Sequence, residues 1–460
     1  MTPSGPSALV ADPALERRVL SGWGRATASA ADVARASASD DVAGLLRRAG
    51  PRGALARGLG RAYGDAAQNA GGVVVDMTGV DLPFLLEDGR LTVGSGASIR
   101  DVHRVIVPAG WMLPVVPGTE SVTMGGALAA DVHGKNHRRD GSFATHVERF
   151  VLATCDGSRE IDSRRDSDEF WATAGGMGLT GVISELTVQL RLIETPMMAV
   201  RTRRHAGMES LLADLLSSDD HYAAAWLDAA ARGRRLGRGV VSTADHARSQ
   251  DLRRHAAHRS RRARPSPTVP PLGPSLIRPG PVRLANASRY HATRTGESLV
   301  PLAAVLHPLD GLAEWHRLYG RAGLVQYQMA VPVGAEDIVG RMLEELGRRR
   351  VLCSLAVLKR LGPGDEGPLS FPIEGCTLAL DLPRAQPELA SLLARFDEWV
   401  IEAGGRVYLA KDSCSTPAAV EAMYPRLPAW RAVRDRMDPG RLMQSDLARR
   451  LGLLGCGRPR

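Results

Sequence analysis

The sequence predicts an α+β protein with more than one domain, on three observations. The chain has 460 residues, whereas a domain typically has about 150. Hydrophobic residues make up 44% and charged residues 24%, a globular composition that excludes a disordered or fibrous chain. Over its first third and a little beyond, short β-like runs alternate with glycine-rich turns and short helices, without a regular βαβ repeat.

Local patterns predict the individual elements. Residues 71–78 and 90–96 are rich in β-branched residues and bounded by glycine, so both are expected to be strands. Residues 98–110 repeat apolar residues at helical spacing and stop at a glycine, which predicts a helix. Residues 176–194 combine a glycine turn with a long alternating strand. Further on, the same patterns predict one strand and two helices, over residues 324–332, 336–350 and 387–405.

The composition changes near residue 196, where arginine becomes frequent, and we expect a domain boundary there. Residues 251–264 carry six arginines against one aspartate, and residues 265–281 contain seven prolines. We therefore expect a mobile basic and proline-rich loop over about residues 245–285. Two interpretations of the basic part stay open, a solubilising insert and an electrostatic patch that faces phosphates or a membrane.

The charged residues are distributed unusually. The formal charge is +9, and all but three of the 59 basic residues are arginines. Because a lysine ammonium and an arginine guanidinium are not interchangeable, the three lysines are candidates for sites that require an ammonium. They are Lys135, Lys359 and Lys411. Nucleic-acid binding is not expected, because the basic stretches lack interleaved aromatic residues and any recognised module.

The segment ARGLGRAYGDAAQN at residues 56–69 has the densest glycine punctuation. Glycines at this density let several backbone N–H groups point into one concavity that suits a phosphate or diphosphate. A second segment, residues 115–147, has Thr123 before Gly125 and Gly126 at the start of a small-residue helix, which is a second candidate anion site. Two such sites together indicate one extended, dinucleotide-like ligand.

Two other patterns carry less weight. Gly176, Gly178 and Gly181 spell the GxGxxG motif, but a strand follows where a Rossmann site needs a helix. In HGKNH, His133 and His137 stand four residues apart, but a glycine lies between them and no carboxylate supplies a third ligand, so no metal site is expected. The five cysteines are far apart without a CxxC pair and are expected to be reduced thiols.

Nine motifs, in order and over essentially the whole chain, resemble the decaprenylphosphoryl-ribose 2-oxidase family, a branch of the vanillyl-alcohol-oxidase-type FAD-binding enzymes. The likeness is most specific in the FAD-binding half. The motifs are GALARGLGRAYGDAAQNAGG (53–72), VPGTESVTMGGALAADVHGKNH (116–137), FWATAGGMGLTGVI (170–183), LHPLD (306–310), QYQ (326–328), GPLSFPI (367–373), AKDS (410–413), AMYPR (422–426) and SDLARRL (445–451).

The resemblance implies an α+β, two-domain PCMH-type FAD-binding fold with an inserted antiparallel-sheet substrate domain. Residues 1–196 would form the FAD-binding domain and residues 197–405 the substrate-binding domain. Residues 406–460 would return to the FAD-binding domain. The loop from Gly60 to Asp65 holds no histidine or cysteine, so non-covalent FAD is expected.

The resemblance also implies which residues contact FAD. They lie in the first glycine loop, in the segment after residue 116, in the turn near residue 180, and at one lysine. These residues are Arg57, Gly58, Leu59, Gly60, Arg61, Tyr63 and Asn69; Pro117, Gly118, Thr119, Thr123, Gly125, Gly126, Ala129, His133, Gly134 and Asn136; Gly178, Gly181, Val182 and Ile183; and Lys411.

The implied chemistry is hydride transfer from a ribose C2 carbon to the flavin while the C2 hydroxyl loses its proton. Lys411 would stabilise negative charge on the reduced flavin, and the other expected catalytic residues would surround the alcohol. The expected catalytic residues are Lys411, His133, Tyr63, Gln328 and Lys135. The expected substrate contacts are Lys359, Arg317, Gln326, Trp226, Thr377 and Ala379.

By this resemblance the substrate would be a polyprenylphosphoryl-β-D-ribose, oxidised to a 2-keto intermediate in the first half of 2-epimerisation for cell-wall arabinan. An NAD(P)H-dependent short-chain reductase would be the partner. No signal peptide or membrane-spanning helix is visible, so we expect a cytoplasmic protein or one peripheral at the membrane. The alternative is a flavin-dependent oxidase of a soluble sugar or nucleoside alcohol in secondary metabolism.

That alternative comes from departures in the substrate half. Where the family has a cysteine two residues after an asparagine, this chain has Ala379 after Thr377, and Cys376 is out of register. A family tyrosine is Leu306 here, and an active-site phenylalanine is Leu361. These changes reshape the expected substrate pocket.

Overall fold

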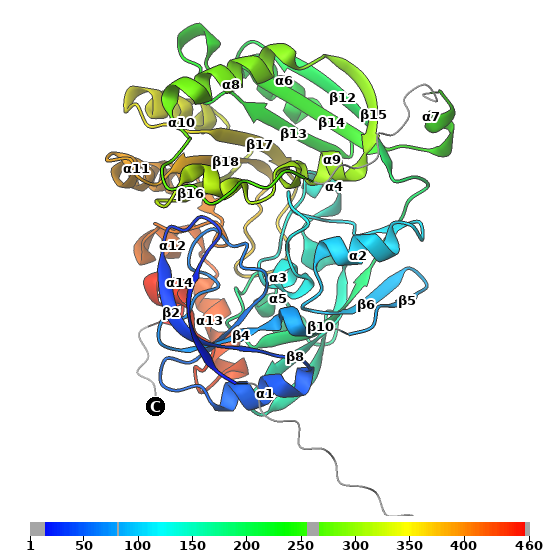
Figure 1. The fold of residues 1–460 in the computed structure, drawn as a ribbon, viewed down its shortest axis with the longest axis vertical. Helices are drawn as coiled ribbons and strands as arrows, with labels where there is room; N and C mark the ends of the chain where they lie inside the picture. Colours follow the sequence, from blue (N-terminus) through cyan, green and yellow to red (C-terminus); the bar gives the residue numbers. More distant parts are fainter. Residues whose placement is uncertain (1–13, 81, 255–265, 456–460) are drawn as a thin grey trace, which may run out of the picture.

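The computed structural model describes residues 14–80, 82–254 and 266–455. Two lobes lie one above the other, and both ends of the described chain belong to the lower lobe (Figure 1). The α+β prediction is confirmed.

The lower lobe holds two main sheets. The first has the order β1-β2-β4-β3, with Glu16–Ser21, Ala28–Arg35, Val73–Asp76 and Ala54–Arg57; β2, β4 and β3 run parallel, and β1 is antiparallel to β2. The second is antiparallel, in the order β5-β6-β10-β8-β9, with Leu85–Glu87, Arg90–Gly94, Val182–Gln189, Val147–Thr154 and Gly157–Asp162. A two-stranded ladder joins β7 (Trp111–Met112) to β11 (Arg191–Leu192).

The helices of the lower lobe begin where the sequence offers caps. Ser98 accepts a hydrogen bond from the Asp101 backbone N–H at the start of α2, and Thr123 caps α3 in the same way. The expected strand at 71–78 is shorter than predicted, because a 3-10 turn, Met77–Gly79, follows β4 directly. The helices are α1 (Ser39–Arg47), α2 (Ile99–Ile106), α3 (Met124–Ala129) and α5 (Ser167–Thr173), while α4 (His137–Asp140) lies against the upper lobe (Figure 1).

The upper lobe is built on one antiparallel sheet of eight strands, in the order β15-β12-β14-β13-β17-β18-β16-β19. Its first strand in the chain begins at Met197, and its last, β19, lies at Arg406–Val407, just past the expected limit at residue 405. The other strands are β13 (Tyr222–Leu227), β14 (Gly239–His246), β15 (Gly296–Pro301), β16 (Leu324–Pro332), β17 (Leu355–Leu361) and β18 (Gly375–Pro383); β12 is Met197–His205.

Strand β18 shows how this sheet divides its two faces. Successive side chains of a strand point to opposite faces. Leu378 and Leu380 are fully buried in one apolar cluster with Leu392 and Phe396 of α11. Thr377, Ala379 and Asp381 therefore lie on the other face. The upper-lobe helices are α6 (Met208–Ser217), α7 (Ser249–Arg254), α8 (Pro279–Ala292), α9 (Leu302–Leu306), α10 (Asp337–Arg348) and α11 (Leu389–Glu402).

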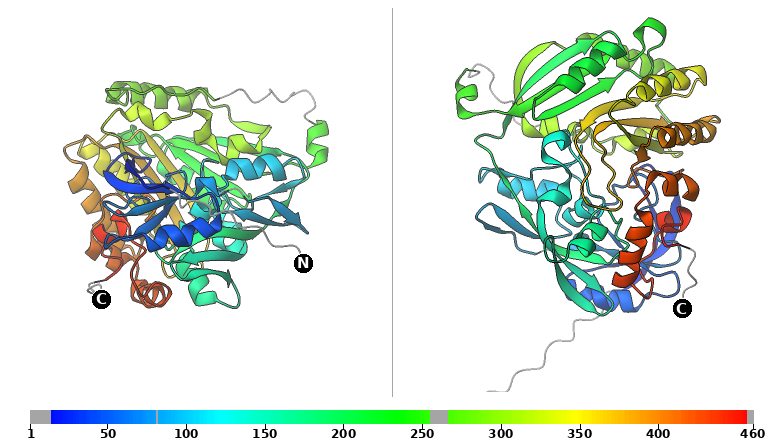
Figure 2. Two further views of the ribbon diagram at one scale, coloured as in Figure 1. Left: turned by 60° about the horizontal axis from the view of Figure 1, so that its bottom comes forward. Right: turned by 180° about the vertical axis from the view of Figure 1, so that it is seen from behind.

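The C-terminal segment returns to the lower lobe, where α12 (Pro417–Met423), α13 (Leu427–Met437) and α14 (Asp446–Arg450) lie beside the N-terminal strands (Figures 1 and 2). Two contacts fasten it. The Trp430 indole N–H donates to the Ala172 carbonyl, and Met443 bridges to Ala54, the first residue of β3. The lower lobe is thus made from both ends of the chain.

The expected loop over 245–285 is only partly irregular. Strand β14 runs to His246, α7 occupies 249–254, and α8 begins at Pro279. The prediction was wrong at both ends because composition does not reveal pairing to β12 and β13. Residues 255–265, most of the basic stretch, lie outside the described residues. Within the described ranges, no helix has the length and apolarity needed to cross a bilayer.

Candidate active site

The two glycine-rich segments of the lower lobe meet. A Cβ atom on Gly58 would lie 2.2 Å from Thr123 Oγ1, so only glycine permits this approach. Gly60 has φ +63°, a left-handed conformation that glycine adopts without strain. Arg61 donates from Nε to the Ser121 carbonyl at 3.1 Å. The structure thus joins the two predicted anion sites into one continuous, backbone-rich surface.

The AKDS segment lies against the same loop. The Tyr63 N–H donates to the Ala410 carbonyl at 3.0 Å, and a Cβ on Gly64 would collide with the Asp412 carbonyl. The Lys411 Nζ lies 4.0 Å from the centroid of the Tyr63 ring. On its other side the segment is tied to the upper sheet, because the Tyr408 N–H donates to the Gln328 carbonyl.

One face of the upper sheet supplies most of the expected catalytic and substrate residues. Gln326 and Gln328 are two residues apart on β16 and are paired in register with Asp381 and Ala379 on β18. The Gln328 amide donates to Thr377 Oγ1 at 3.2 Å and lies 2.8 Å from His133 Nε2, while Gln326 donates to Asp381. The sheet face therefore reaches the HGKNH segment directly.

The three lysines converge on this region. Burial, and then the charges of Lys135 and Lys411, lower the pKa of Lys359 to about 7. Burial lowers the pKa of Lys411 to about 8, although the charge of Asp381 opposes this shift. Burial and Arg289 lower the pKa of Lys135 to about 8, and its Nζ donates to the Val305 carbonyl. An anionic ligand would suit this region, because it would stabilise the charged forms that burial disfavours in all three amines.

His133 is held as a neutral ring. Burial, and then the charges of Lys359, His137 and Lys411, lower its pKa well below the ordinary value. If the Gln328 amide donates to Nε2, the proton is on Nδ1, and Nδ1 is buried without a partner in the described part of the chain. The ring stacks near Phe371, at 5.1 Å between centroids, and Tyr408. His133 is therefore suited to donating a hydrogen bond to a ligand rather than to accepting a proton.

Three of the predicted cofactor residues are buried in the protein. Asn69 is fully buried, donates to the Gly53 carbonyl and accepts from Arg449, so it holds the loop in place. Asn136 is likewise buried, donating to the Pro114 carbonyl and to Asp140. Val182 is also fully buried. Cofactor contacts for these three residues stay a prediction, and the structure gives the two asparagines a role in supporting the loops.

Arg317 is also displaced from its expected place. Its guanidinium donates to the Val269 carbonyl and pairs with Glu314 at 3.1 Å, and no described contact joins it to Lys359. Trp226 is buried on β13, in register with Val357 of β17, and its ring lies 4.7 Å from the Arg289 guanidinium carbon. This position suits a wall of the lysine-lined region.

The remaining predicted cofactor residues lie along the meeting segments. Gly178 and Gly181 have positive φ angles and make the turn before β10, as expected. Most of the others are partly exposed residues of the two loops, and Leu59 is 41% exposed. They are Arg57, Pro117, Gly118, Thr119, Gly125, Gly126 and Ala129, with Gly134 and Ile183 buried beside them.

The structure adds residues that sequence reasoning missed. Asp381 is buried beside Gln326, and burial raises its pKa to about 6. Phe371 packs on His133, and Arg450 pairs with both Asp65 and Asp412. The motifs GPLSFPI and SDLARRL contain Phe371 and Arg450, so the signal was present. Only the fold shows what these side chains contact.

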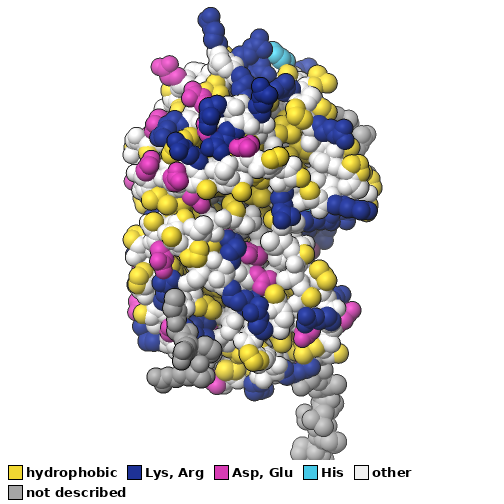
Figure 3. All heavy atoms as spheres, turned by 90° about the vertical axis from the view of Figure 1, so that its left-hand side faces the viewer, with side chains coloured by type: hydrophobic (Ala, Val, Ile, Leu, Met, Phe, Trp, Pro, Cys, Tyr) yellow, Lys and Arg dark blue, Asp and Glu magenta, His cyan; other side chains and the backbone are white. Residues whose placement is uncertain are grey.

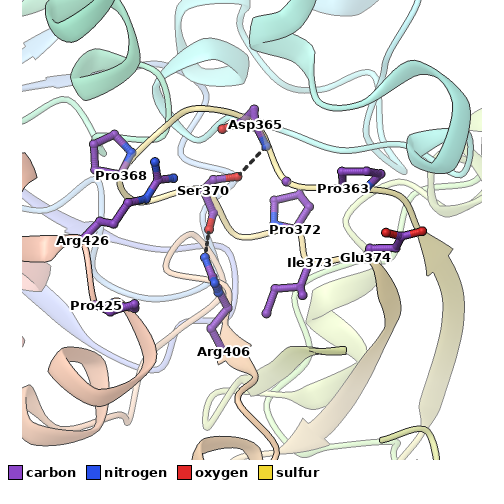
Figure 4. A pocket seen from close by; sticks show the side chains of 11 residues that line it. Pro363, Asp365, Pro368, Ser370, Pro372, Ile373, Glu374, Arg406, Pro425 and Arg426 are labelled. Carbon is purple, nitrogen blue, oxygen red and sulfur yellow. Dashed lines mark hydrogen bonds between the residues drawn. The ribbon is translucent and has the colours of Figure 1, made fainter. Parts of the chain in front are cut away.

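A separate pocket lies outside this site (Figure 4). It is lined by the loop between β17 and β18, including Asp365, Ser370 and Pro372, and by Arg406 and Arg426. Arg406 donates to the Ser370 carbonyl at 2.6 Å. Phe371 is not among the lining residues, since its ring packs on His133.

The residues present fit a flavin dinucleotide. The joined glycine loops offer backbone N–H groups for a diphosphate, the unpaired His133 Nδ1 offers a buried donor, and Lys411 offers a positive charge.

Comparison with known proteins also indicates a flavin-binding protein. The FAD binding domain family model matches residues 30–161, and the D-arabinono-1,4-lactone oxidase model matches residues 382–451. The protein is a two-domain FAD-dependent oxidoreductase.

Full-length relatives specify the family. A decaprenylphosphoryl-beta-D-ribose oxidase of Mycolicibacterium smegmatis is 36% identical over 449 residues, which cover 95% of this chain and 97% of the relative. The chain belongs to this oxidase family. An uncharacterised Streptomyces coelicolor protein is 41% identical, covering 77% of this chain and all of the relative. An L-gulono-1,4-lactone dehydrogenase of Mycobacterium tuberculosis is 23% identical, covering 94% and 99%.

The geometry indicates how the chain supports oxidation of an alcohol. Bound FAD supplies the acceptor for the hydride that leaves the alcohol carbon. Gln328 and Thr377 offer hydrogen bonds that can orient a hydroxyl group on the sheet face. Lys359, with a pKa lowered to about 7, can accept a proton near neutral pH. Lys411 holds a positive charge beside Tyr63, where it can stabilise developing negative charge.

Proposed function

We propose that the protein oxidises the C2 hydroxyl of a polyprenylphosphoryl-β-D-ribose to the 2-keto intermediate, the first half of a 2-epimerisation that supplies the arabinose form for cell-wall arabinan. The observation that carries this proposal is the convergence of three partly buried lysines beside Gln328, Thr377 and His133. Such a site offers both phosphate contacts and groups that orient a hydroxyl. The likeness to the Mycolicibacterium smegmatis oxidase supports the same substrate.

The substrate class can be tested by anaerobic bleaching of the flavin absorbance. We expect a polyprenylphosphoryl-ribose analogue to bleach the flavin of the purified protein, and soluble sugar alcohols to leave it oxidised. Removing the phosphate from the analogue should weaken bleaching, since a lysine-lined site loses its anionic partner. Bleaching by a soluble alcohol alone would contradict the proposed substrate and leave the flavin chemistry intact.

The alternative substrate, a soluble sugar or nucleoside alcohol, rests on particular residues. Ala379 faces the same side of β18 as Thr377, directly opposite Gln328, so the absence of the family cysteine changes the reaction surface itself. Leu306 and Leu361 are almost fully buried. Leu306 lacks the hydroxyl group of the family tyrosine, and Leu361 lacks the aromatic ring of the family phenylalanine. The L-gulono-1,4-lactone dehydrogenase relative acts, by its name, on a soluble sugar lactone.

We further propose that the protein acts at a membrane surface. We also propose that its partner is an NAD(P)H-dependent short-chain reductase, which reduces the keto product. The upper lobe carries many basic side chains (Figure 3). Among them, Arg234, Arg235 and Arg283 line one pocket with Arg232 and Arg238. The first three make no ion pair among the described residues, so they are free for lipid phosphates. Reduction of the keto sugar to the arabinose form requires a hydride donor. NAD(P)H bound to such a reductase would supply that hydride.

The FAD is expected to be non-covalent. The loop from Gly60 to Asp65 holds no histidine or cysteine that could carry the flavin. Acid precipitation should therefore release the flavin into the supernatant. Yellow, fluorescent protein in the pellet after washing would show a covalent bond.

A further inference from the structure

Three side chains from distant parts of the chain converge beside the Pro117–Thr119 turn. His103 comes from α2, Glu120 from the segment before α3, and His307 from the end of α9 in the upper lobe. Glu120 Oε1 lies 3.5 Å from His103 Nδ1 and 3.8 Å from His307 Nε2. The three atoms lie within 4.8 Å of one another.

A backbone hydrogen bond orients the His307 ring in this cluster. His307 Nδ1 lies 3.0 Å from the Pro117 carbonyl, which can only accept, so Nδ1 carries a proton and donates it. The other ring nitrogen, Nε2, lies 3.8 Å from Glu120 Oε1. A backbone bond from one ring nitrogen is also how metal-binding histidines are commonly oriented.

His103 adds a third unpaired acceptor. Its side chain is 5% exposed, and neither ring nitrogen has a hydrogen-bond partner within the described chain. His307 Nε2 is likewise buried without one. Buried polar atoms without partners are costly, and a cation between the two imidazoles and the carboxylate would give a partner to one nitrogen of each ring. In a tetrahedral zinc site, with bonds of about 2.0–2.1 Å, neighbouring ligand atoms are about 3.3 Å apart, close to the two observed distances.

The surroundings keep Glu120 Oε1 available. The other oxygen, Oε2, faces Arg100 Nε at 3.5 Å. Asp310 accepts hydrogen bonds from Thr119 Oγ1 and the Glu120 N–H, which holds the Glu120 backbone in place. Arg100 also lies 3.8 Å from Asp310, so this arginine faces both carboxylates and contacts Glu120 through Oε2, while Oε1 faces the two imidazoles.

We propose that His103, Glu120 and His307 bind a divalent transition metal ion, with zinc the best match, and that the metal fastens the upper lobe to the cofactor loop. Two imidazoles and one carboxylate are a recognised zinc ligand set that leaves a fourth position for water. Glu120, 18% exposed, gives that position access to solvent. The sequence predicted no metal site at the HGKNH pair. It gave no sign of this second cluster, because His103 and His307 are too far apart in sequence to form a motif.

The test is metal content and affinity of the FAD-loaded protein. The protein is first loaded with Zn²⁺ and then dialysed against a weak chelator. The unmodified protein should retain about one zinc per chain. Glu120→Gln and His103→Asn should lower zinc affinity more than about 100-fold, since even outer-shell changes cost roughly 10- to 100-fold. His291→Asn, at the exposed end of α8, is the matched control and should retain zinc.

A second measurement protects the test against misfolding of a variant. Zinc should raise the thermal midpoint of the unmodified protein and of His291→Asn, because a ligand that binds only the folded state stabilises it, and should leave that of Glu120→Gln unchanged. Loss of all zinc to the chelator would overturn the proposal. Equal zinc retention by Glu120→Gln, His103→Asn and the unmodified protein would overturn it too, because the metal would then bind elsewhere.

Discussion

Replacing Lys411 with methionine should slow anaerobic reduction of the flavin by the alcohol substrate by about 100-fold or more, the usual cost of removing one group that stabilises developing charge. The Lys411 Nζ lies over the Tyr63 ring, where the AKDS segment contacts the glycine loop. Methionine keeps the length and apolar volume of the side chain. Stopped-flow bleaching of bound flavin measures the rate directly.

The same substitution at Lys135 is the comparison. The Lys135 ammonium already donates to the Val305 carbonyl, so Lys135→Met should slow flavin reduction less than Lys411→Met does. Both variants should keep the bound-flavin spectrum, which shows that the cofactor remains. Equal rates in Lys411→Met and the unmodified protein would remove Lys411 from the chemistry.

Replacing Arg450 with alanine should destabilise the protein by about 3 kcal/mol and weaken FAD binding. Arg450 forms a two-bond pair with Asp65, at 2.7 and 2.9 Å, and a bond of 2.8 Å to Asp412. Both carboxylates are nearly fully buried, and removing one partner of a buried pair costs about 3–5 kcal/mol. We take the low end because the Arg450 side chain is 26% exposed.

The effect on FAD follows from the neighbours of the two carboxylates. Asp65 comes two residues after Tyr63, and Asp412 follows Lys411, so Arg450 holds the two cofactor segments together. Urea unfolding followed by tryptophan fluorescence, together with flavin release, measures both effects. Arg436→Ala is the control: its side chain is 58% exposed and lies 3.5 Å from Asp168, so the change should stay within about 0.5 kcal/mol. If Arg450→Ala were as stable as Arg436→Ala, the proposed role of Arg450 in holding the two cofactor segments together would be wrong.

Parts of this molecule could be predicted from sequence because their signals are local. Glycine density marked the loops around Gly58 and Gly125, since only glycine allows the close backbone approach found there. The scarcity of lysine marked Lys359 and Lys411, which the structure brings together. The strand at Leu324–Pro332 coincides with its predicted limits, because apolar and β-branched residues continue to the turn at either end.

Other parts depend on which segments become neighbours. Asp381 joins the site because β18 pairs with β16 in the sheet although the two strands are far apart in the chain. Asn69 is held in the interior because Arg449, 380 residues away, supplies a hydrogen-bond partner. His103, Glu120 and His307 meet only because the upper lobe packs on the cofactor loop.

By itself, the sequence determined the family, the flavin and the segments that carry the chemistry, because each of these is indicated by particular residue types at short spacing in the chain. The tertiary structure alone decided which side chains face the ligand, which are buried as supports, and which carboxylate each cation meets. Pairing over long sequence separations is set by sheet order and by the packing of the two lobes, and neither leaves a local pattern.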